Sequence, residues 1–321
     1  MKPVIEPVSR EALKAELTPQ TLLRTTNRAG NELYVVGPEA VNVIREIGRL
    51  REIAFRAGGG GTGEPLDIDK FDTDPAYAYR QLVLWDPEAQ EIIGGYRFCL
   101  CDEAVFDREG QPVLTSSHMF RFTKKFIKHY LPYTVELGRS FVSVDYQSSK
   151  SGSKSIYALD NLFDGIASIG VLFKKRIRYF FGKATIYREY PTEARELVMC
   201  FLKKYFGKGH RLLQIRKEVK VEKRRRYYRF FKGLDYKEGY RVLKAKVLEY
   251  GVSIPPLVNT YMNLSPTMIY FGTGINDEFG DVYDSGLLVN FKEMYPEKKK
   301  RHLDSFLQQN LHKILRRLQK K

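Results

Sequence analysis

The segment Thr134-Val135-Glu136-Leu137-Gly138-Arg139-Ser140-Phe141-Val142 decides the fold of this chain. Its β-branched and aromatic residues predict a strand. Glu136 and Arg139 lie three positions apart, an odd spacing that places their side chains on opposite faces of a regular strand. Gly138 between them favours a bulge, which would re-aim one of the two side chains. The segment therefore predicts a strand that belongs to a functional site.

Three polar blocks lie upstream of this segment. They are Gly58-Gly59-Gly60-Gly61, Asp67-Ile68-Asp69-Lys70-Phe71-Asp72 and Gly94-Gly95-Tyr96-Arg97. The glycines formally match a dinucleotide-binding fingerprint, but they follow a helix where that fingerprint follows a strand, so the match is accidental. The aspartates could bind Mg²⁺ or Mn²⁺ as a D-x-D motif does. Packing of these carboxylates against arginines such as Arg51, Arg56 or Arg97 is favoured over a metal site.

Hydrophobic periodicity around the blocks predicts strands broken by helices. Strands are expected at 31–36, 78–85, 91–100, 134–144, 178–186 and 286–291, and helices from Ser9 and at 38–57, 156–173 and 191–206, with a further segment at 267–271. This order is typical of an α/β or α+β layered fold. We expect an N-terminal arm over 1–30, one domain over 31–295 and a basic amphipathic C-terminal helix over 296–321.

Positive charge is abundant and unevenly distributed. The net charge is +16, and between Lys203 and Lys246 there are 17 Lys and Arg against 4 Asp and Glu. So dense a cluster should attract an anionic partner, namely nucleic acid, anionic lipid or an acidic protein, with a solvated basic face as the alternative. Leucines at helical spacing among basic residues after Pro296 predict a helix that lies on an anionic membrane surface or docks on the domain.

The cysteines and the N-terminal sequence indicate in which cellular compartment we expect the protein. Cys99, Cys101 and Cys200 form neither a CxxC pair nor a cluster with histidines, so we expect neither a disulfide framework nor a metal site. The first residues lack the apolar run of a signal peptide, and no stretch reaches about 18 apolar residues. We expect a cytoplasmic protein, either free or peripheral on the inner face of the membrane.

Several catalytic classes lack their signatures. There is no G-x-S-x-G elbow, no histidine with an aspartate five positions on, no P-loop lysine and no HExxH motif. Among the candidate catalytic groups, carboxylates and arginines remain. A strand that splays at a bulge leaves free N–H groups that can stabilise the oxyanion of acyl transfer, and a nearby carboxylate can take a proton from an amine. A structural ion pair between Glu136 and Arg139 is the alternative.

Taken in order, these blocks resemble the acyl-carrier-protein-dependent branch of the GNAT acyltransferases, closest to the hemolysin-like N-acyltransferases of ornithine-lipid and glycine-lipid synthesis. The match covers roughly 45–290 and includes Ile254-Pro255-Pro256-Leu257 and Asn276-Asp277-Glu278-Phe279-Gly280. The first part is also similar to acyl-homoserine-lactone synthases. Their active-site positions correspond by motif to Arg51, Phe55, Asp69, Asp72, Arg97, Glu136 and Arg139. The resemblance implies a GNAT-like central mixed twisted sheet flanked by helices, with a C-terminal extension.

The resemblance also implies a reaction. A fatty acyl group, expected to be 3-hydroxylated, would pass from acyl carrier protein to the α-amine of an amino acid, either glycine or ornithine. Glu136 would act as the general base, and backbone N–H groups near Phe141 and Val142 would hold the thioester oxygen. Arg97 or Arg139 would pair with the acceptor carboxylate. For glycine, a bulky residue such as Tyr96 or Trp85 would form a wall of a small acceptor pocket, and Glu136 and Arg139 are the central catalytic pair.

The loop that follows the 134–144 strand indicates which acyl donor to expect. Residues 147–153 keep only one glycine of the motif by which ordinary GNATs bind the CoA pyrophosphate, so the loop suits the single phosphodiester of phosphopantetheine. The acyl-phosphopantetheine of the carrier would be a co-substrate, with no bound cofactor. Basic residues would steer the acidic carrier to the site. These carrier-binding residues are Lys203, Lys204, Arg224, Arg225 and Arg226.

Two other function classes stay open at this point. A non-catalytic module that binds lipid or a carrier protein would keep the basic surface and tolerate loss of Glu136 and Arg139. A nucleic-acid binder would use the arginines and aromatic residues of 224–231 for phosphate contacts and base stacking. No RRM, KH or zinc-knuckle motif accompanies them, so we expect no nucleic-acid partner.

Overall fold

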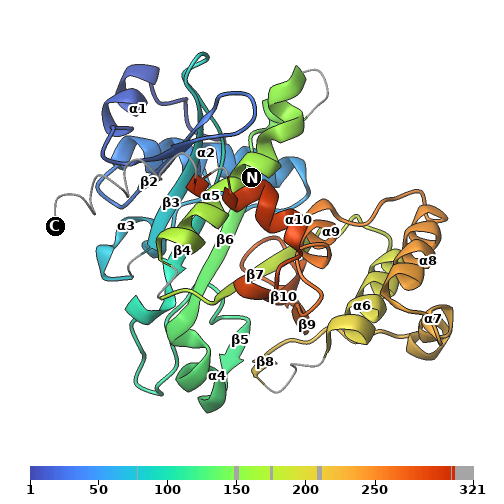
Figure 1. The fold of residues 1–321 in the computed structure, drawn as a ribbon. Helices are drawn as coiled ribbons and strands as arrows, with labels where there is room; N and C mark the ends of the chain where they lie inside the picture. Colours follow the sequence, from blue (N-terminus) through green and yellow to red (C-terminus); the bar gives the residue numbers. More distant parts are fainter. Residues whose placement is uncertain (78, 148–151, 174–175, 208–211, 305, 308–321) are drawn as a thin grey trace.

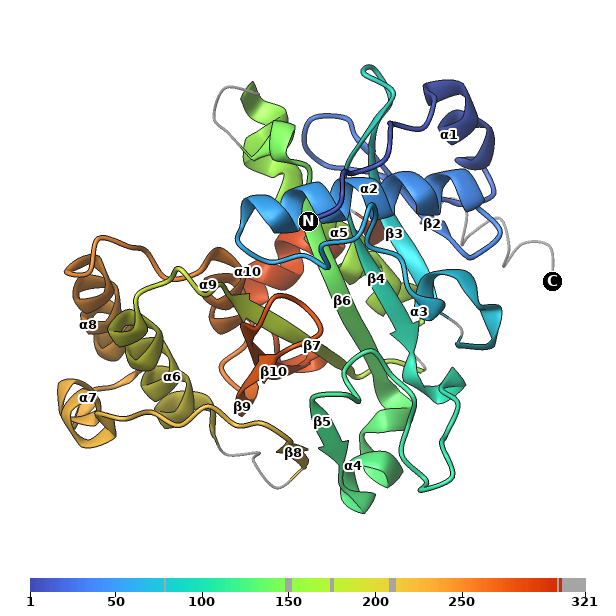
Figure 2. The same ribbon diagram turned by 180° about the vertical axis from the view of Figure 1, so that it is seen from behind.

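The fold is organised around one large mixed β-sheet, shown from opposite sides in Figures 1 and 2. The computed structural model describes residues 1–77, 79–147, 152–173, 176–207, 212–304, 306 and 307. The sheet has the strand order β1-β2-β3-β4-β6-β7-β10-β9. Its strands are β1 (Leu22–Thr25), β2 (Glu32–Val36), β3 (Tyr79–Asp86), β4 (Glu91–Leu100), β6 (Thr134–Val142), β7 (Tyr179–Ile186), β9 (Ile269–Asn276) and β10 (Val282–Asn290).

Helices cover both faces of this sheet. Helix α2 (Val41–Ala57) lies over one face and α5 (Gly152–Leu172) over the other, as Figures 1 and 2 show. Each forms a separate hydrophobic cluster, with Val43, Ile47 and Phe55 on the α2 face and Leu162, Ile166 and Ile169 on the α5 face. The predicted layered GNAT-like fold, with a mixed sheet between helices, is confirmed.

Several element boundaries differ from the sequence expectations. Helix α2 begins at Val41 because the Ala40 N–H donates to the Gly37 carbonyl, which places Pro38 in a turn before the helix. β9 and β10 are both longer than the segments expected there, and α5 begins at Gly152. A small second sheet of β5 (Phe120–Phe122) and β8 (Leu213–Ile215), with α4 (Lys124–His129) after β5, was not expected.

The basic region forms a helical subdomain on one side of the sheet. Its helices α6 (Thr192–Phe206), α7 (Arg224–Phe231) and α8 (Tyr236–Leu248) lie together in Figure 1, and α9 (Pro256–Met262) leads back to the sheet. Phe201 packs against Phe231, Tyr236 and Tyr240 and joins the three helices. A capping box between Asp235 and Glu238 begins α8. These aromatic residues continue the hydrophobic cluster of the α5 face beneath a charged surface.

Both ends of the described chain pack on the domain. Helix α1 (Arg10–Glu16) rests on α2 through Leu13, and β1 extends the sheet, so residues 1–30 share the domain's sheet and core. At the other end α10 (Pro296–Lys299) is followed by His302, whose Nδ1 lies 2.7 Å from Asp164 Oδ1 on α5. Most of the predicted C-terminal helix, 308–321, lies outside the described residues. The three-part domain division stays a prediction.

None of the helices in the described part of the chain has the length and apolar content needed to cross a membrane.

Candidate active site

The strand quoted first carries a β-bulge at the position that its glycine favoured. Gly95 of β4 pairs with Phe141 and Arg97 pairs with Gly138, so the single residue Tyr96 lies opposite two residues of β6. One of these two, Arg139, has a φ of 49°, in the left-handed region that non-glycine residues rarely adopt. The bulge redirects the Arg139 side chain, and such strained positions cluster at functional sites.

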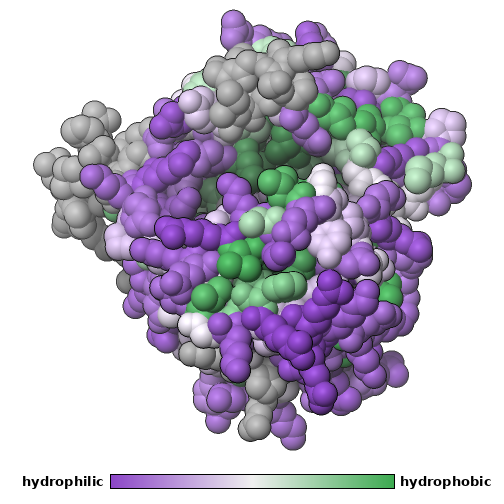
Figure 3. All heavy atoms as spheres, turned by 90° about the vertical axis from the view of Figure 1, so that its right-hand side faces the viewer, coloured by the Kyte–Doolittle hydropathy of each residue, from purple (hydrophilic) through white to green (hydrophobic). Residues whose placement is uncertain are grey.

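Strands β6 and β7 then separate and open a cavity between them. Their parallel pairing runs from Thr134–Tyr179 to Leu137–Gly182 and stops there, although both strands continue. A cavity of about 760 Å³ occupies the gap. Figure 3, which looks onto the α6–α8 side of the molecule, shows a hollow with hydrophobic walls within a largely hydrophilic surface. The size is in the range of ordinary ligand pockets.

The cavity has an apolar half and a charged half, which belong to opposite faces of the sheet. On the α5 and α9 face it is lined by Leu137, Val142, Leu159, Ile186, Leu257 and Tyr261. On the α2 face it is lined by Phe55, Arg139, Phe141, Lys183, Tyr187 and Asp284. Such a site can hold a long apolar group from one side and a small charged molecule from the other.

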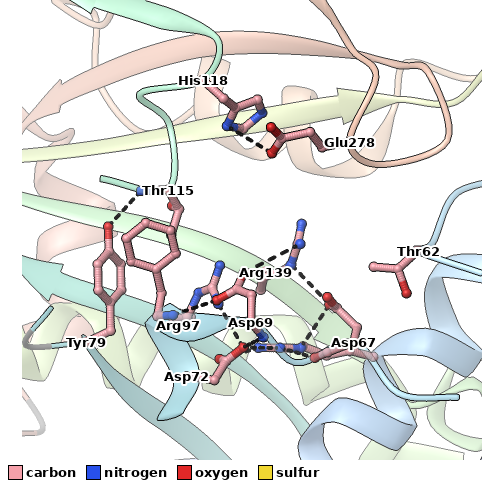
Figure 4. A network of polar contacts seen from close by, with 12 residues as sticks. Thr62, Asp67, Asp69, Asp72, Tyr79, Arg97, Thr115, His118, Arg139 and Glu278 are labelled. Atoms are coloured by element: carbon pink, nitrogen blue, oxygen red, sulfur yellow. Dashed lines mark hydrogen bonds and ion pairs between the residues drawn. The ribbon is translucent and has the colours of Figure 1, made fainter. Parts of the chain in front are cut away.

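Arg139 belongs to a chain of alternating arginines and aspartates, drawn in Figure 4. Arg139 Nε lies 3.0 Å from Asp67 Oδ2, which lies 3.1 Å from Arg51 Nε. Arg51 also reaches Asp72 at 2.9 Å, and Asp72 accepts a 2.8 Å hydrogen bond from Arg97 Nη1. Arg97 in turn binds Asp69 at 2.6 Å. The expected packing of this carboxylate cluster on Arg51 and Arg97 is confirmed, whereas Arg56 pairs with Glu52.

Two arginines of this cluster keep Asp72 ionised. Burial disfavours a charged Asp72, but Arg51 and Arg97 hold its pKa well below the ordinary value. Burial lowers the pKa of Arg139, with Asp67 acting against it, and the guanidinium nevertheless stays protonated. Arg97 pairs with Asp69 and Asp72 and does not line the cavity. Arg139 does line the cavity, and its guanidinium carbon lies 4.6 Å from the centre of the Phe279 ring.

Glu136 lies away from the cavity. Its side chain is 2% exposed, and its carboxylate accepts hydrogen bonds from the Tyr79 hydroxyl, from Thr115 Oγ1 at 2.9 Å and from Ser116 N at 3.0 Å. These contacts fix the 115–116 loop beside β6. The catalytic role that we predicted for Glu136 stays a prediction, and its contacts are those of a structural brace.

A second polar group, which sequence reasoning missed, lines the cavity opposite Arg139. The Lys183 ammonium of β7 lies 3.4 Å from Asp284 Oδ2 of β10. Asp284 also accepts hydrogen bonds from Thr185 at 2.6 Å and from Asn276 at 2.8 Å, and these donors together with Lys183 lower its pKa despite its burial. This group could have been identified in the sequence from a lysine and an aspartate that interrupt apolar strands. Burying such charged residues is costly unless they have a partner or a function.

The remaining predicted residues fall into two groups. Phe55 lines the cavity, whereas Trp85 is buried among the residues that pack on α2 and takes no part in the cavity wall. Among the predicted carrier-binding residues, Arg224, Arg225 and Arg226 are exposed and begin α7. Lys204 instead donates to the Phe231 and Leu234 carbonyls and so supports the end of α7. Lys203 lines a groove of about 370 Å³ together with Arg224.

Comparisons with known proteins add to this geometry. Residues 50–154 match the acetyltransferase (GNAT) domain family. The chain is 49% identical over 312 residues to a glycine N(alpha)-acyltransferase of Phocaeicola vulgatus, with 97% of this chain and 95% of that protein covered. It is 48% identical over 310 residues to a glycine N(alpha)-acyltransferase of Bacteroides thetaiotaomicron, covering 96% of this chain and 91% of that protein.

Two solved structures are more distant. One is FeeM, an N-acyl amino acid synthase from uncultured soil microbes, at 10% identity and a TM-score of 0.39, covering 85% of this chain and 95% of that chain. The other is BjaI, a CoA-dependent acyl-homoserine lactone synthase, at 10% identity and a TM-score of 0.35, covering 87% of this chain and 89% of that chain.

Proposed function

The chain belongs to the family of these glycine N(alpha)-acyltransferases and is an acyltransferase, and from this premise we propose that it transfers a fatty acyl group from acyl carrier protein to the α-amine of glycine. The observation that carries the proposal is the two-sided cavity at the separation of β6 and β7. Its apolar half suits an acyl chain, and its charged half suits an amino acid.

The reaction needs no covalent intermediate on the protein. The amine nitrogen attacks the thioester carbonyl carbon, the carbon–sulfur bond breaks, and the amine loses a proton while the thiolate gains one. Beyond Leu137, the β6 edge no longer pairs with β7, and backbone N–H groups near Phe141 and Val142 would hold the carbonyl oxygen as charge develops on it. Close placement of the two substrates supplies much of the remaining rate enhancement.

Two cations support an acceptor that carries a carboxylate. Arg139 on β6 and Lys183 on β7 line the charged half of the cavity, one on each of the separating strands. The Arg139 Nε pairs with Asp67 at 3.0 Å, but its Nη2 reaches Asp69 only at 3.9 Å, and the Lys183 ammonium has a 3.4 Å ion pair and a 3.7 Å thioether contact. Both retain donors for a carboxylate, which arginine binds best in a bidentate manner.

Glycine is favoured over ornithine by the names of the two relatives, and the buried carboxylates near the cavity are already engaged, although exposed Glu189 also lines it. Ornithine has a second amine that would need its own acidic partner. Asp69 and Asp72 are engaged by Arg97, and Asp284 is engaged by three donors. Aromatic rings of Phe55, Tyr187 and Phe279 narrow the pocket further.

Expression in a host without N-acylated amino acids tests the proposal. Mass spectrometry of the lipid extract should detect N-acyl-glycine, and an Arg139→Ala variant should produce none above the empty-vector level. Detection of N-acyl-ornithine in place of N-acyl-glycine would show that the acceptor is ornithine. A folded, abundant protein that yields no acylated amine would contradict the proposed activity and leave a lipid- or carrier-binding role.

The exposed start of α7 supports an acidic carrier as the donor. Replacing Arg224, Arg225 and Arg226 together by glutamate should raise the KM for acyl carrier protein about 10-fold at low salt, because charge steering and rim pairs are lost. The KM for a carrier-free acyl-pantetheine thioester should not change. The matched control converts Lys124, Lys125 and Lys128 of α4, which are also exposed, to glutamate. Equal KM increases in both triple variants would show a net-charge effect and contradict a carrier site on α7.

A further inference from the structure

The proposed reaction needs a proton acceptor in the charged half of the cavity. At neutral pH an amino acid carries its amine as an ammonium group, which cannot attack a carbonyl carbon until it loses a proton. Enzymes meet this need with a general base that reaches the amine directly or through one water molecule. The Glu136 carboxylate, expected as this base from the sequence, does not line the cavity, and neither does the His118 ring.

Among the described residues, the carboxylates that line the cavity are those of Asp284 and Glu189. Asp284 is buried, and the donors Thr185, Asn276 and Lys183 together hold its pKa below the ordinary value. A carboxylate whose ionised form is stabilised in this way is a weak proton acceptor. Glu189 is exposed, and within the described part of the chain its carboxylate has no hydrogen bond or ion pair. Glu189 therefore has its lone pairs available to a substrate.

The position of the Glu189 carboxylate places it on the acceptor side of the cavity. Glu189 follows β7, and its carboxylate lies against Gly59 just after α2, where any side chain would collide with it. The ring of Phe279 packs on the next residue, Gly60, and its centre lies 4.6 Å from the guanidinium carbon of Arg139. The glycine run at 58–61 thus brings a carboxylate without a partner to the half of the cavity that holds Arg139.

We propose that Glu189 is the catalytic base that takes a proton from the ammonium group of the acceptor. The inference rests on the proposed acyltransferase function and on the binding of the acceptor carboxylate by Arg139. The ammonium gives one proton to Glu189, and the freed amine attacks the thioester carbon. The carbon–sulfur bond then breaks, and a second proton passes from the nitrogen to the departing thiolate. Because Glu189 is exposed, it releases its proton to water before the next turnover.

The titratable groups next to Glu189 in the chain do not compete for this role. Tyr187 lines the cavity, but burial and the nearby Asp284 raise the pKa of its phenol, so at neutral pH the phenol holds its proton. Arg188 is a cation and pairs with Asp281 at 3.2 Å on the surface. Neither group can accept a proton from the acceptor at neutral pH.

A pH profile of Glu189→Gln tests the inference. We would measure kcat/KM for glycine with an acyl-pantetheine thioester from about pH 6 to about pH 9. At pH 7 the variant should be about 100-fold slower than the unaltered protein, as expected for loss of a general base. The variant depends on glycine whose amine is already unprotonated, a fraction that rises about tenfold for each pH unit below the pKa of the amine. The defect should therefore shrink about tenfold per pH unit.

A second acceptor and a matched control sharpen this test. Aminooxyacetate has the carboxylate of glycine, but its amine is unprotonated at neutral pH, so Glu189→Gln should slow its acylation by less than about threefold. Glu249→Gln is the control, because Glu249 is also an exposed glutamate and does not line the cavity. This control should have the rates of the unaltered protein with both acceptors.

The outcomes separate this inference from the proposed function. A defect of Glu189→Gln that is constant across the pH range, or equal for glycine and aminooxyacetate, would show a structural role and overturn the inference. A pH-dependent defect in Asp284→Asn or Glu136→Gln, with Glu189→Gln fully active, would move the base to that residue and also overturn it. In these cases the proposed function would stand. No transfer to glycine by the unaltered protein would remove the proposed function and the inference together.

Discussion

Replacing Arg139 with alanine should lower kcat/KM for glycine by about 100-fold and leave the KM for the acyl donor unchanged. Arg139 lines the charged half of the cavity, its side chain is 20% exposed, and its Nη2 has only a long ion pair of 3.9 Å to Asp69. A charge-assisted hydrogen bond contributes roughly 1.5–3 kcal/mol. Since 1.4 kcal/mol corresponds to a factor of ten, two such contacts to a carboxylate account for an effect of this order. Steady-state kinetics with varied glycine is the measurement.

An acceptor without a carboxylate provides the decisive comparison. Glycinamide should be a poor substrate for the unaltered protein, and Arg139→Ala should affect it little, so the preference for glycine over glycinamide should collapse. Arg188→Ala serves as the control, because Arg188 forms only an exposed ion pair with Asp281. If Arg139→Ala slowed both acceptors to the same extent, Arg139 would act on the reaction itself or on the bulge and would not bind the acceptor carboxylate.

Replacing Asp72 with asparagine should destabilise the fold by about 3–5 kcal/mol, the usual cost of breaking a buried ion pair from one side. The Asp72 carboxylate accepts from Arg51, Arg97 and Gln81, and both arginines are buried with it. Asparagine keeps the shape but leaves two buried cations undercompensated. Because folded proteins are stable by only about 5–15 kcal/mol, the loss should be evident in urea unfolding at pH 7.

The same variant has a pH dependence of defined sign. The folded-state pKa of Asp72 lies below the unfolded value of about 3.9, so its stabilising effect is present above that pH and is lost as pH falls toward the folded pKa. The difference between the unaltered protein and Asp72→Asn should therefore shrink below about pH 4. Asp281→Asn, which removes an exposed partner of Arg188, should change stability by no more than about 1 kcal/mol. A constant difference down to pH 2 would contradict this account.

Local patterns predicted the elements that carry their own signals. Apolar alternation located β3, β4 and β7, and Gly138 within a β-branched run indicated the bulge that aims Arg139. The aspartate block was correctly expected to pack on Arg51 and Arg97. In each case the decisive contact joins residues whose spacing or chemistry is visible in a short window of sequence.

Contacts between distant segments could not be read in this way. Asp284 and Lys183 meet because β10 inserts between β7 and β9, and no local pattern records that strand order. Tyr261 reaches Tyr96 only because α9 returns to the sheet after the helical subdomain. Glu136 was expected at the reaction centre from its place in a motif. Regular alternation before the bulge places Glu136 on the α2 face like the charged half of the cavity, but its carboxylate is held away from the cavity by the 115–116 loop.

The cavity that crosses the sheet has a consequence for how the reactants arrive. In the proposed reaction the apolar acyl donor would occupy the α5 side and the amino acid the α2 side, so neither would have to leave before the other enters. The three cysteines are buried and none lines the described cavity, so no thiol there is placed to carry the acyl group between two separate visits. We therefore expect both substrates to be bound together when the amide bond forms. The sheet would thus separate the acyl chain from the amino acid, and the gap between β6 and β7 would connect the two halves of the cavity.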